Sequence, residues 1–167
     1  MANTARSKRE AVAKTEMLIR KPVSEVFAAF TEPEMITKFW LARASGRLEP
    51  GARVHWDFIV QGAESNVEVK ELKPDERILI SWADGDTVDF RFTRRGPRET
   101  FVTIENRGFT GDADEVCDKA VDATGGFTLV LCELKALLEH GIHMNYGPDK
   151  FPDARLNIER HARLDAS

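Results

Sequence analysis

The chain of 167 residues has a hydrophobic fraction of 42% and a charged fraction of 31%, which suits one globular domain whose core needs no disulfide or metal. Its formal net charge is −4 and charges of both signs are interspersed, so there is no general electrostatic reason for binding nucleic acid or an anionic membrane. No apolar run is long enough to cross a bilayer.

The first forty residues predict a flexible segment, a strand and two short helices. Residues 1–14 are polar and lack the apolar stretch of a secretory signal, so we expect a flexible segment and a cytoplasmic protein. Residues 15–20 are a short run with three apolar residues that ends before a proline, which predicts a strand. Helices are expected at 23–31 and 34–39, where apolar residues recur at helical spacing just after a proline.

Beyond Leu41 the apolar residues alternate instead, and turn residues recur between the runs. This pattern predicts an antiparallel meander with one apolar face and one charged face. Together with the first strand and a strand at 45–49, it gives a sheet of about seven strands. The inner register is unusually aromatic, with Trp56, Phe58, Trp82, Phe90 and Phe92.

A long helix is expected from about Asp112 to His140, with acidic residues at its start and Gly141 just past its end. Its apolar stripe would pack against the inner face of the sheet. The adjacent Gly125 and Gly126 cost roughly 1 kcal/mol each relative to alanine, which predicts a kink or a close approach by a bulky neighbour. The prolines and scattered apolar residues of 142–167 favour a tail packed on a domain that spans 15–141.

This element order resembles the helix-grip fold of the START-like superfamily, also called SRPBCC. Several short phrases occur in the order and spacing of one of its families, the one named for the activator of the heat-shock protein 90 ATPase. They are Ile19-Arg20-Lys21-Pro22-Val23-Ser24-Glu25-Val26-Phe27, Phe39-Trp40, Val69-Lys70-Glu71-Leu72-Lys73-Pro74, Ile80-Ser81-Trp82, Arg107-Gly108-Phe109 and Leu134-Lys135-Ala136-Leu137-Leu138-Glu139. The resemblance spans about 15–141 and implies an α+β fold, a curved antiparallel sheet wrapped around the long carboxy-terminal helix. It also implies a hydrophobic ligand enclosed between sheet and helix.

The aromatic inner face indicates a pocket wall, although simple core packing is the alternative for each of its residues. Trp40 would lie at the mouth, with Phe127 opposite it beside the two glycines. The expected ligand-binding residues are Trp40, Trp56, Phe58, Trp82, Phe90, Phe92, Ile104, Phe127 and Leu131. Three polar residues of the inner register near strand ends are candidates for orienting a polar group of the ligand: Glu71, Thr100 and Asn106.

No disulfide, metal site or cofactor is expected. Cys117 and Cys132 fall in one helix and would be about 22 Å apart at the usual rise per residue, so both are expected to be reduced and buried. The four histidines are widely spread, and His140 with His143 spans a helix end rather than one face.

Three functions remain open. The leading hypothesis is a non-enzymatic protein that binds a hydrophobic or amphipathic small molecule, such as a lipid. A cyclase or hydrolase on the same scaffold is the first alternative, although alternation places His55, Asp57, Asp89 and Glu105 on the outer face, away from the expected pocket. The second alternative is a chaperone partner that activates an ATPase, although the separate amino-terminal chaperone-binding domain of the eukaryotic activators has no counterpart in this chain. The ligand and the oligomeric state are left open.

Overall fold

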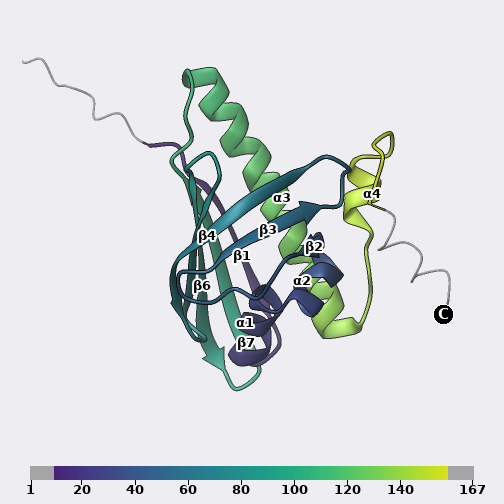
Figure 1. Ribbon diagram of the computed structural model, residues 1–167. Coiled ribbons are helices and arrows are strands. Elements are labelled where there is room, and N and C mark those ends of the chain that lie inside the picture. The colour runs from purple at the N-terminus through teal and green to yellow at the C-terminus, as the bar shows by residue number, and fades with distance from the viewer. Residues whose placement is uncertain (1–9, 158–167) are drawn as a thin grey trace, which may run out of the picture.

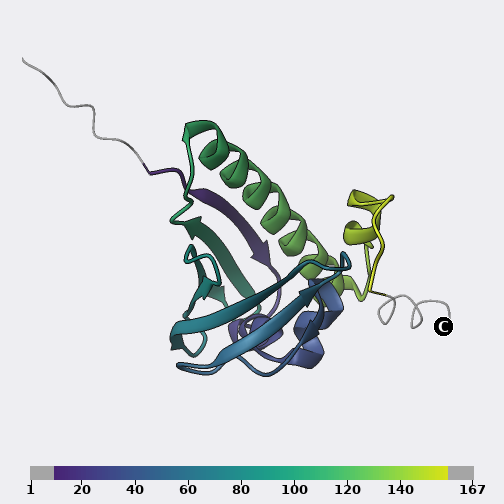
Figure 2. The same ribbon diagram turned by 45° about the horizontal axis from the view of Figure 1, so that its top comes forward.

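The structure is a computed structural model that describes residues 10–157, so the expectations for 1–9 and 158–167 lie outside the described residues. Within this range seven antiparallel strands form one sheet in the order β1-β7-β6-β5-β4-β3-β2, and the sheet curves around helix α3 (Figures 1 and 2). The α+β helix-grip architecture expected from the sequence is confirmed. The strands are β1 (Ala13–Ile19), β2 (Leu41–Ala44), β3 (Arg53–Phe58), β4 (Glu64–Lys73), β5 (Arg77–Trp82), β6 (Thr87–Gly96) and β7 (Glu99–Arg107).

The second strand lies before the segment expected for it. β2 pairs Leu41 with Phe58 and Ala44 with Trp56, so the strand ends before residue 45. The chain then leaves the sheet, and the backbone N–H of Leu48 donates to the carbonyl of Thr31 instead. Leu48 is therefore buried beside the first helix rather than in a strand, and the expected strand at 45–49 is wrong.

Helices α1 (Val23–Thr31) and α2 (Pro33–Phe39) close one end of the curved sheet. Pro22 directly precedes α1 and Pro33 is the first residue of α2, and the missing N–H of a proline is not needed at the start of a helix. The ring of Phe30 on α1 meets Phe39, Phe90 and Phe92 at centroid distances of 5.4, 5.3 and 5.6 Å. This end of the interior is therefore densely packed.

Helix α3 (Ala113–His140) matches its expected bounds to within one residue. Asp112 and Glu115 form a capping box at its start, and Gly141 ends it in the left-handed conformation (φ 67°). The helix continues through Gly125 and Gly126, and a Cβ added at either glycine would meet nothing within 4 Å, so the expected bulky neighbour is not there.

The apolar side of α3 is buried only along its carboxy-terminal half, at Phe127, Val130, Leu131 and Leu134. Its first turns extend beyond the strands (Figure 1), and Val121 is 67% exposed. Cys117 is exposed in this region, which corrects the expectation of a buried thiol, whereas Cys132 is half-buried.

The segment after α3 returns to the sheet and carries a short helix, α4 (Tyr146–Lys150). The backbone N–H of Met144 donates to both carboxylate oxygens of the fully buried Glu133, each at 3.1 Å. Further along, the backbone N–H of Gln61 donates to the carbonyl of Arg155 at 2.7 Å, and the side chain of Asn157 donates to the carbonyl of Phe58 at 2.7 Å. These bonds hold α4 beside the turn between β3 and β4. Among the described residues, no helix is long and apolar enough to cross a membrane.

Candidate functional site

An apolar cleft of about 510 Å³ lies between the open end of the sheet, the middle of α3 and the short helix α4. This volume falls within the roughly 300–1,000 Å³ of typical small-molecule sites. The sheet side is formed by β3, β5, β7 and the turn after β3, with Phe58, Ile59, Val60, Ala63, Trp82 and Asn106; Trp40 adds the end of α2. The helical side is formed by Asp122, Ala123, Gly126, Phe127, Val130, Tyr146, Gly147, Lys150 and Phe151.

Trp40 is the centre of the aromatic wall. Its ring lies 5.1 Å from Trp56, 6.5 Å from Trp82 and 5.7 Å from Phe127, all edge to face, and it is 6% exposed. Edge-to-face contacts of this kind are a favoured packing of aromatic rings. Trp40 therefore joins rings from the sheet and from α3 into one aromatic surface.

The structure divides the expected ligand-binding residues into three groups. Trp40, Phe58, Trp82 and Phe127 line the cleft. Trp56 and Phe90 lie directly behind them and contact Trp40. Phe92, Ile104 and Leu131 are buried in the hydrophobic core outside the cleft lining, as the packing alternative would have them.

The structure also places the three expected polar residues in different environments. Asn106 lines the cleft, whereas the hydroxyl of Thr100 donates to the carbonyl of Lys21 at 2.9 Å and Thr100 is fully buried. The expectation that Glu71 faces inward is wrong. A register shift between Val69 and Glu71 places Glu71 opposite Leu79, on the outer face of the sheet.

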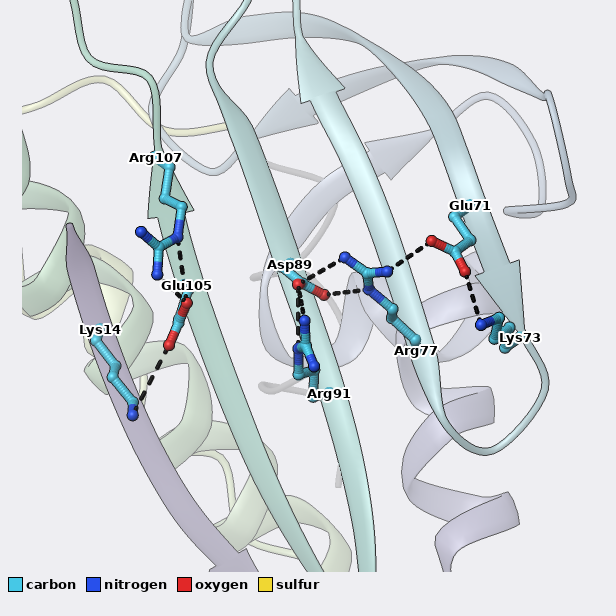
Figure 3. A network of polar contacts seen from close by, with 8 residues as sticks. All are labelled: Lys14, Glu71, Lys73, Arg77, Asp89, Arg91, Glu105 and Arg107. Carbon is cyan, nitrogen blue, oxygen red and sulfur yellow. Dashed lines mark hydrogen bonds and ion pairs between the residues drawn. The ribbon is translucent and has the colours of Figure 1, made fainter. Parts of the chain in front are cut away.

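On that outer face Glu71 belongs to a row of ion pairs (Figure 3). The guanidinium of Arg77 donates to Glu71 at 2.6 Å and to both oxygens of Asp89 at 2.9 Å. Burial alone would raise the pKa of Asp89, but the hydrogen bonds from Arg77 and Arg91 outweigh burial and hold this pKa below its ordinary value. This network stabilises the sheet and lies on the face opposite the cleft.

Asn106 is the buried polar group of the cleft, and it is held from behind by the turn between β5 and β6. Its Nδ2 donates to Oδ2 of Asp86 at 2.6 Å and to the carbonyl of Thr87 at 2.9 Å. Asp86 is 8% exposed, and its other carboxylate oxygen, Oδ1, has no hydrogen-bond partner among the described residues. Burial, with a smaller contribution from the neighbouring Asp84, raises the pKa of Asp86 to about 6.

Helix α4 is the part of the site that sequence reasoning missed. Gly147 lies so close to the β3–β4 turn that a Cβ there would come within 2.7 Å of Ile59 Cγ2. Asn145, just before the helix, has a left-handed backbone (φ 55°). The glycine and the asparagine in the segment after α3 were the available signals of a close contact, but they do not say which element is contacted.

The outer face also carries His55, Asp57 and Glu64, whose ligand atoms lie within 4.8 Å of one another. The side chain of Arg43 already pairs with Asp57 at 3.3 Å, and His55 Nδ1 shares a 2.9 Å hydrogen bond with Asn66 Oδ1. That hydrogen bond raises the pKa of His55, and the two carboxylates raise it further. Cross-strand ion pairing accounts for this half-exposed cluster without an ion.

Comparisons with known proteins agree with this fold. The family described as activator of Hsp90 ATPase homolog 1-like protein matches residues 20–139. A solved protein from Staphylococcus saprophyticus, SSP2350, is 27% identical, with a TM-score of 0.70 over 80% of this chain and 96% of that one. DynU16, of the dynemicin biosynthetic locus, is 22% identical, with a TM-score of 0.68 over 80% of this chain and 49% of that one.

The Aha1 dimer from Colwellia psychrerythraea is 19% identical, with a TM-score of 0.68 over 78% of this chain and 97% of that one. At such identities the likeness to DynU16 and Aha1 concerns the fold. The search of curated proteins gave no match.

Proposed function

Because the chain belongs to the family of activator of Hsp90 ATPase homolog 1-like proteins, we propose that it binds a hydrophobic or amphipathic small molecule in the cleft between its sheet, α3 and α4. One observation carries the proposal: an open cleft of about 510 Å³ is lined mostly by apolar side chains and bordered by aromatic rings that pack edge to face. Clefts of this size and lining are the usual sites at which proteins bind small apolar molecules.

The small residues on α3 support the same proposal. Gly126 and Ala123 face the cleft from the helix, where larger side chains would fill it. A Cβ at Gly126 would meet nothing within 4 Å, so the glycine is not required by packing. Its lack of a side chain leaves this part of the cleft open, at a cost to the helix of about 1 kcal/mol relative to alanine.

Helix α4 completes the container. Phe151 and Tyr146 line the cleft from this segment, which Glu133 anchors by accepting a hydrogen bond from the backbone of Met144. Phe151 remains 43% exposed. An apolar residue at the rim that is half-covered in the protein gains further burial when an apolar molecule enters.

Titration with the neutral fluorescent probe N-phenyl-1-naphthylamine tests the proposal. The two neighbouring glycines provide a matched pair, because a Cβ meets nothing within 4 Å at either one and only Gly126 lines the cleft. Leucine favours the helix over glycine at both positions. We expect the wild type and Gly125→Leu to bind the probe equally, and Gly126→Leu to bind it about tenfold more weakly or worse, a loss of about 1.4 kcal/mol.

Circular dichroism would show that both leucine variants keep the fold. Equal affinities for the wild type and both variants would contradict the proposal, and so would an equal loss in both variants.

Catalysis and chaperone binding are not part of this proposal. The titratable side chains of the cleft lining are Asp122, Tyr146 and Lys150, and Asp122 and Lys150 are exposed at the rim. No observation in residues 10–157 brings two of them together as an acid and a base. A chaperone partner and a cytoplasmic location stay predictions from the sequence.

A further inference from the structure

Among the described residues that line the cleft, Asn106 is the polar residue that is buried, whereas Asp122 and Lys150 are exposed and Tyr146 is half-buried. Asn106 belongs to the inner register of β7, opposite Val88 of β6, and is 3% exposed. The residue is part of the cleft lining. What this amide can offer a ligand depends on which of its two polar atoms is already engaged.

The hydrogen bonds of Asn106 decide that question. Nδ2 uses both of its hydrogens, one on Asp86 Oδ2 and one on the carbonyl of Thr87. Above about pH 6, where the carboxyl of Asp86 is ionised, both partners are acceptors, so the amide cannot be turned around without facing oxygen to oxygen. The nitrogen is therefore fixed on the protein side and the oxygen on the other.

The Oδ1 atom of Asn106 remains available to a ligand. Among the described residues Oδ1 of Asn106 accepts no hydrogen bond, and it is not among the side-chain atoms that are sealed without a partner. Since Asn106 is almost fully buried and borders the cleft, the cleft is where this oxygen can be reached.

From this arrangement we infer that, if the cleft binds an apolar molecule as proposed, the preferred ligand has an apolar ring or chain with one hydroxyl or N–H group that donates to Asn106 Oδ1. A ligand that covers the oxygen without donating leaves a buried acceptor unsatisfied, and proteins reject such analogues far more strongly than analogues that lack a methylene. Because Asp86 and Thr87 prevent the amide from turning, Asn106 cannot adapt to an ether or a ketone. Asn106, held by Asp86 and Thr87, therefore favours ligands that donate a hydrogen bond over ligands that can only accept one.

Two probes of nearly the same shape test this inference: 2-naphthol, which carries a donor, and 2-methoxynaphthalene, which does not. Each would be titrated against the wild-type protein by displacement of N-phenyl-1-naphthylamine. We expect 2-naphthol to bind about tenfold more tightly than 2-methoxynaphthalene, because only the naphthol satisfies the amide oxygen. In Asn106→Leu we expect the two affinities to become equal.

Thr100→Val is the matched control, because Thr100 is also a buried polar residue of the inner register of β7 and its hydroxyl bonds to Lys21 rather than lining the cleft. It should keep the preference for the naphthol. If Asn106→Leu does not fold, the ratio of the two affinities in the wild-type protein still tests whether the cleft prefers a ligand with a hydrogen-bond donor.

The outcomes separate this inference from the proposed function. Equal binding of the two probes by the wild type would overturn the inference and leave the cleft as an apolar binding site. Failure of both probes to displace N-phenyl-1-naphthylamine would count against the proposed function itself.

Discussion

The two ends of the space between the sheet and α3 differ in what fills them. At one end Phe30, Phe39, Leu131 and Leu134 are at most 1% exposed and close the interior. At the other end Trp40, Trp82 and Phe127 border a cleft of about 510 Å³. Both ends have aromatic side chains from the same inner register of the sheet.

What distinguishes the ends is the opposing surface. The packed end receives leucines from α3 and phenylalanines from α1 and α2, whereas the open end receives Gly126 and Ala123 from α3 and the short helix α4. The wall is thus similar in both places, and the size of the residues that face it determines whether a core or a cleft results.

The largest effect on stability is expected when a phenylalanine is replaced by alanine at each of the two ends. Phe30→Ala should cost about 4 kcal/mol of the free energy of unfolding, because it leaves a cavity in the packed end. Phe58→Ala should cost about 1 kcal/mol, because Phe58 already borders open space. Urea denaturation monitored by circular dichroism measures both values. Similar losses would show that the two ends are packed alike.

The second prediction concerns the buried carboxyl behind the open end. The folded-state pKa of Asp86 is about 6, above its ordinary value of 3.8, so between these pH values the folded protein binds more protons than the unfolded chain. The stabilisation is fully present below pH 3.8 and is lost as the pH rises through about 6. Asp86→Asn is neutral throughout, keeps an acceptor for Asn106 and supplies a donor for Asp84.

We therefore expect Asp86→Asn to stabilise the protein by about 1–3 kcal/mol at pH 8 and hardly at all at pH 4. Urea denaturation at the two pH values provides the measurement. A stabilisation of the same size at both would mean that burial does not perturb this carboxyl.

The smallest effect is expected at the helix that faces the cleft. Gly126→Ala should stabilise the protein by about 0.5–1 kcal/mol, because the added Cβ meets nothing within 4 Å and alanine favours the helix. Thermal unfolding compared with Gly125→Ala, which should give the same gain, measures the effect. Destabilisation by Gly126→Ala alone would mean that the cleft is narrower than described.

Elements with strong local signals were predictable from the sequence. The capping residues at Asp112 and Gly141 set the bounds of α3, and the alternation of Val88, Phe90 and Phe92 set the inner face of β6. Such signals depend on neighbouring residues, which a single sequence contains.

The remaining features depend on contacts between distant residues. Glu71 changes faces because one extra residue is inserted in β4, and alternation counted along the sequence does not reveal the insertion. Helix α4 reaches the cleft through the carboxylate of Glu133 and the turn around Ile59, neither of which is near it in sequence. Four of the expected ligand-binding residues line the cleft. Ile104 and Leu131 also occupy inward-facing apolar positions, but they lie in the packed core, and the sequence pattern alone does not separate the two groups.

The central claim is that small molecules bind on the inner side of the sheet. A polar groove of about 550 Å³ on the outer side, lined by His55, Asn66 and Ser81, is the competing location. Amide chemical-shift mapping of the nitrogen-15-labelled protein during titration with 2-naphthol distinguishes the two directly. We expect the largest shifts at four residues that surround the inner cleft, Phe58, Ala63, Gly126 and Gly147. Shifts concentrated at His55, Asn66 and Ser81 would contradict it.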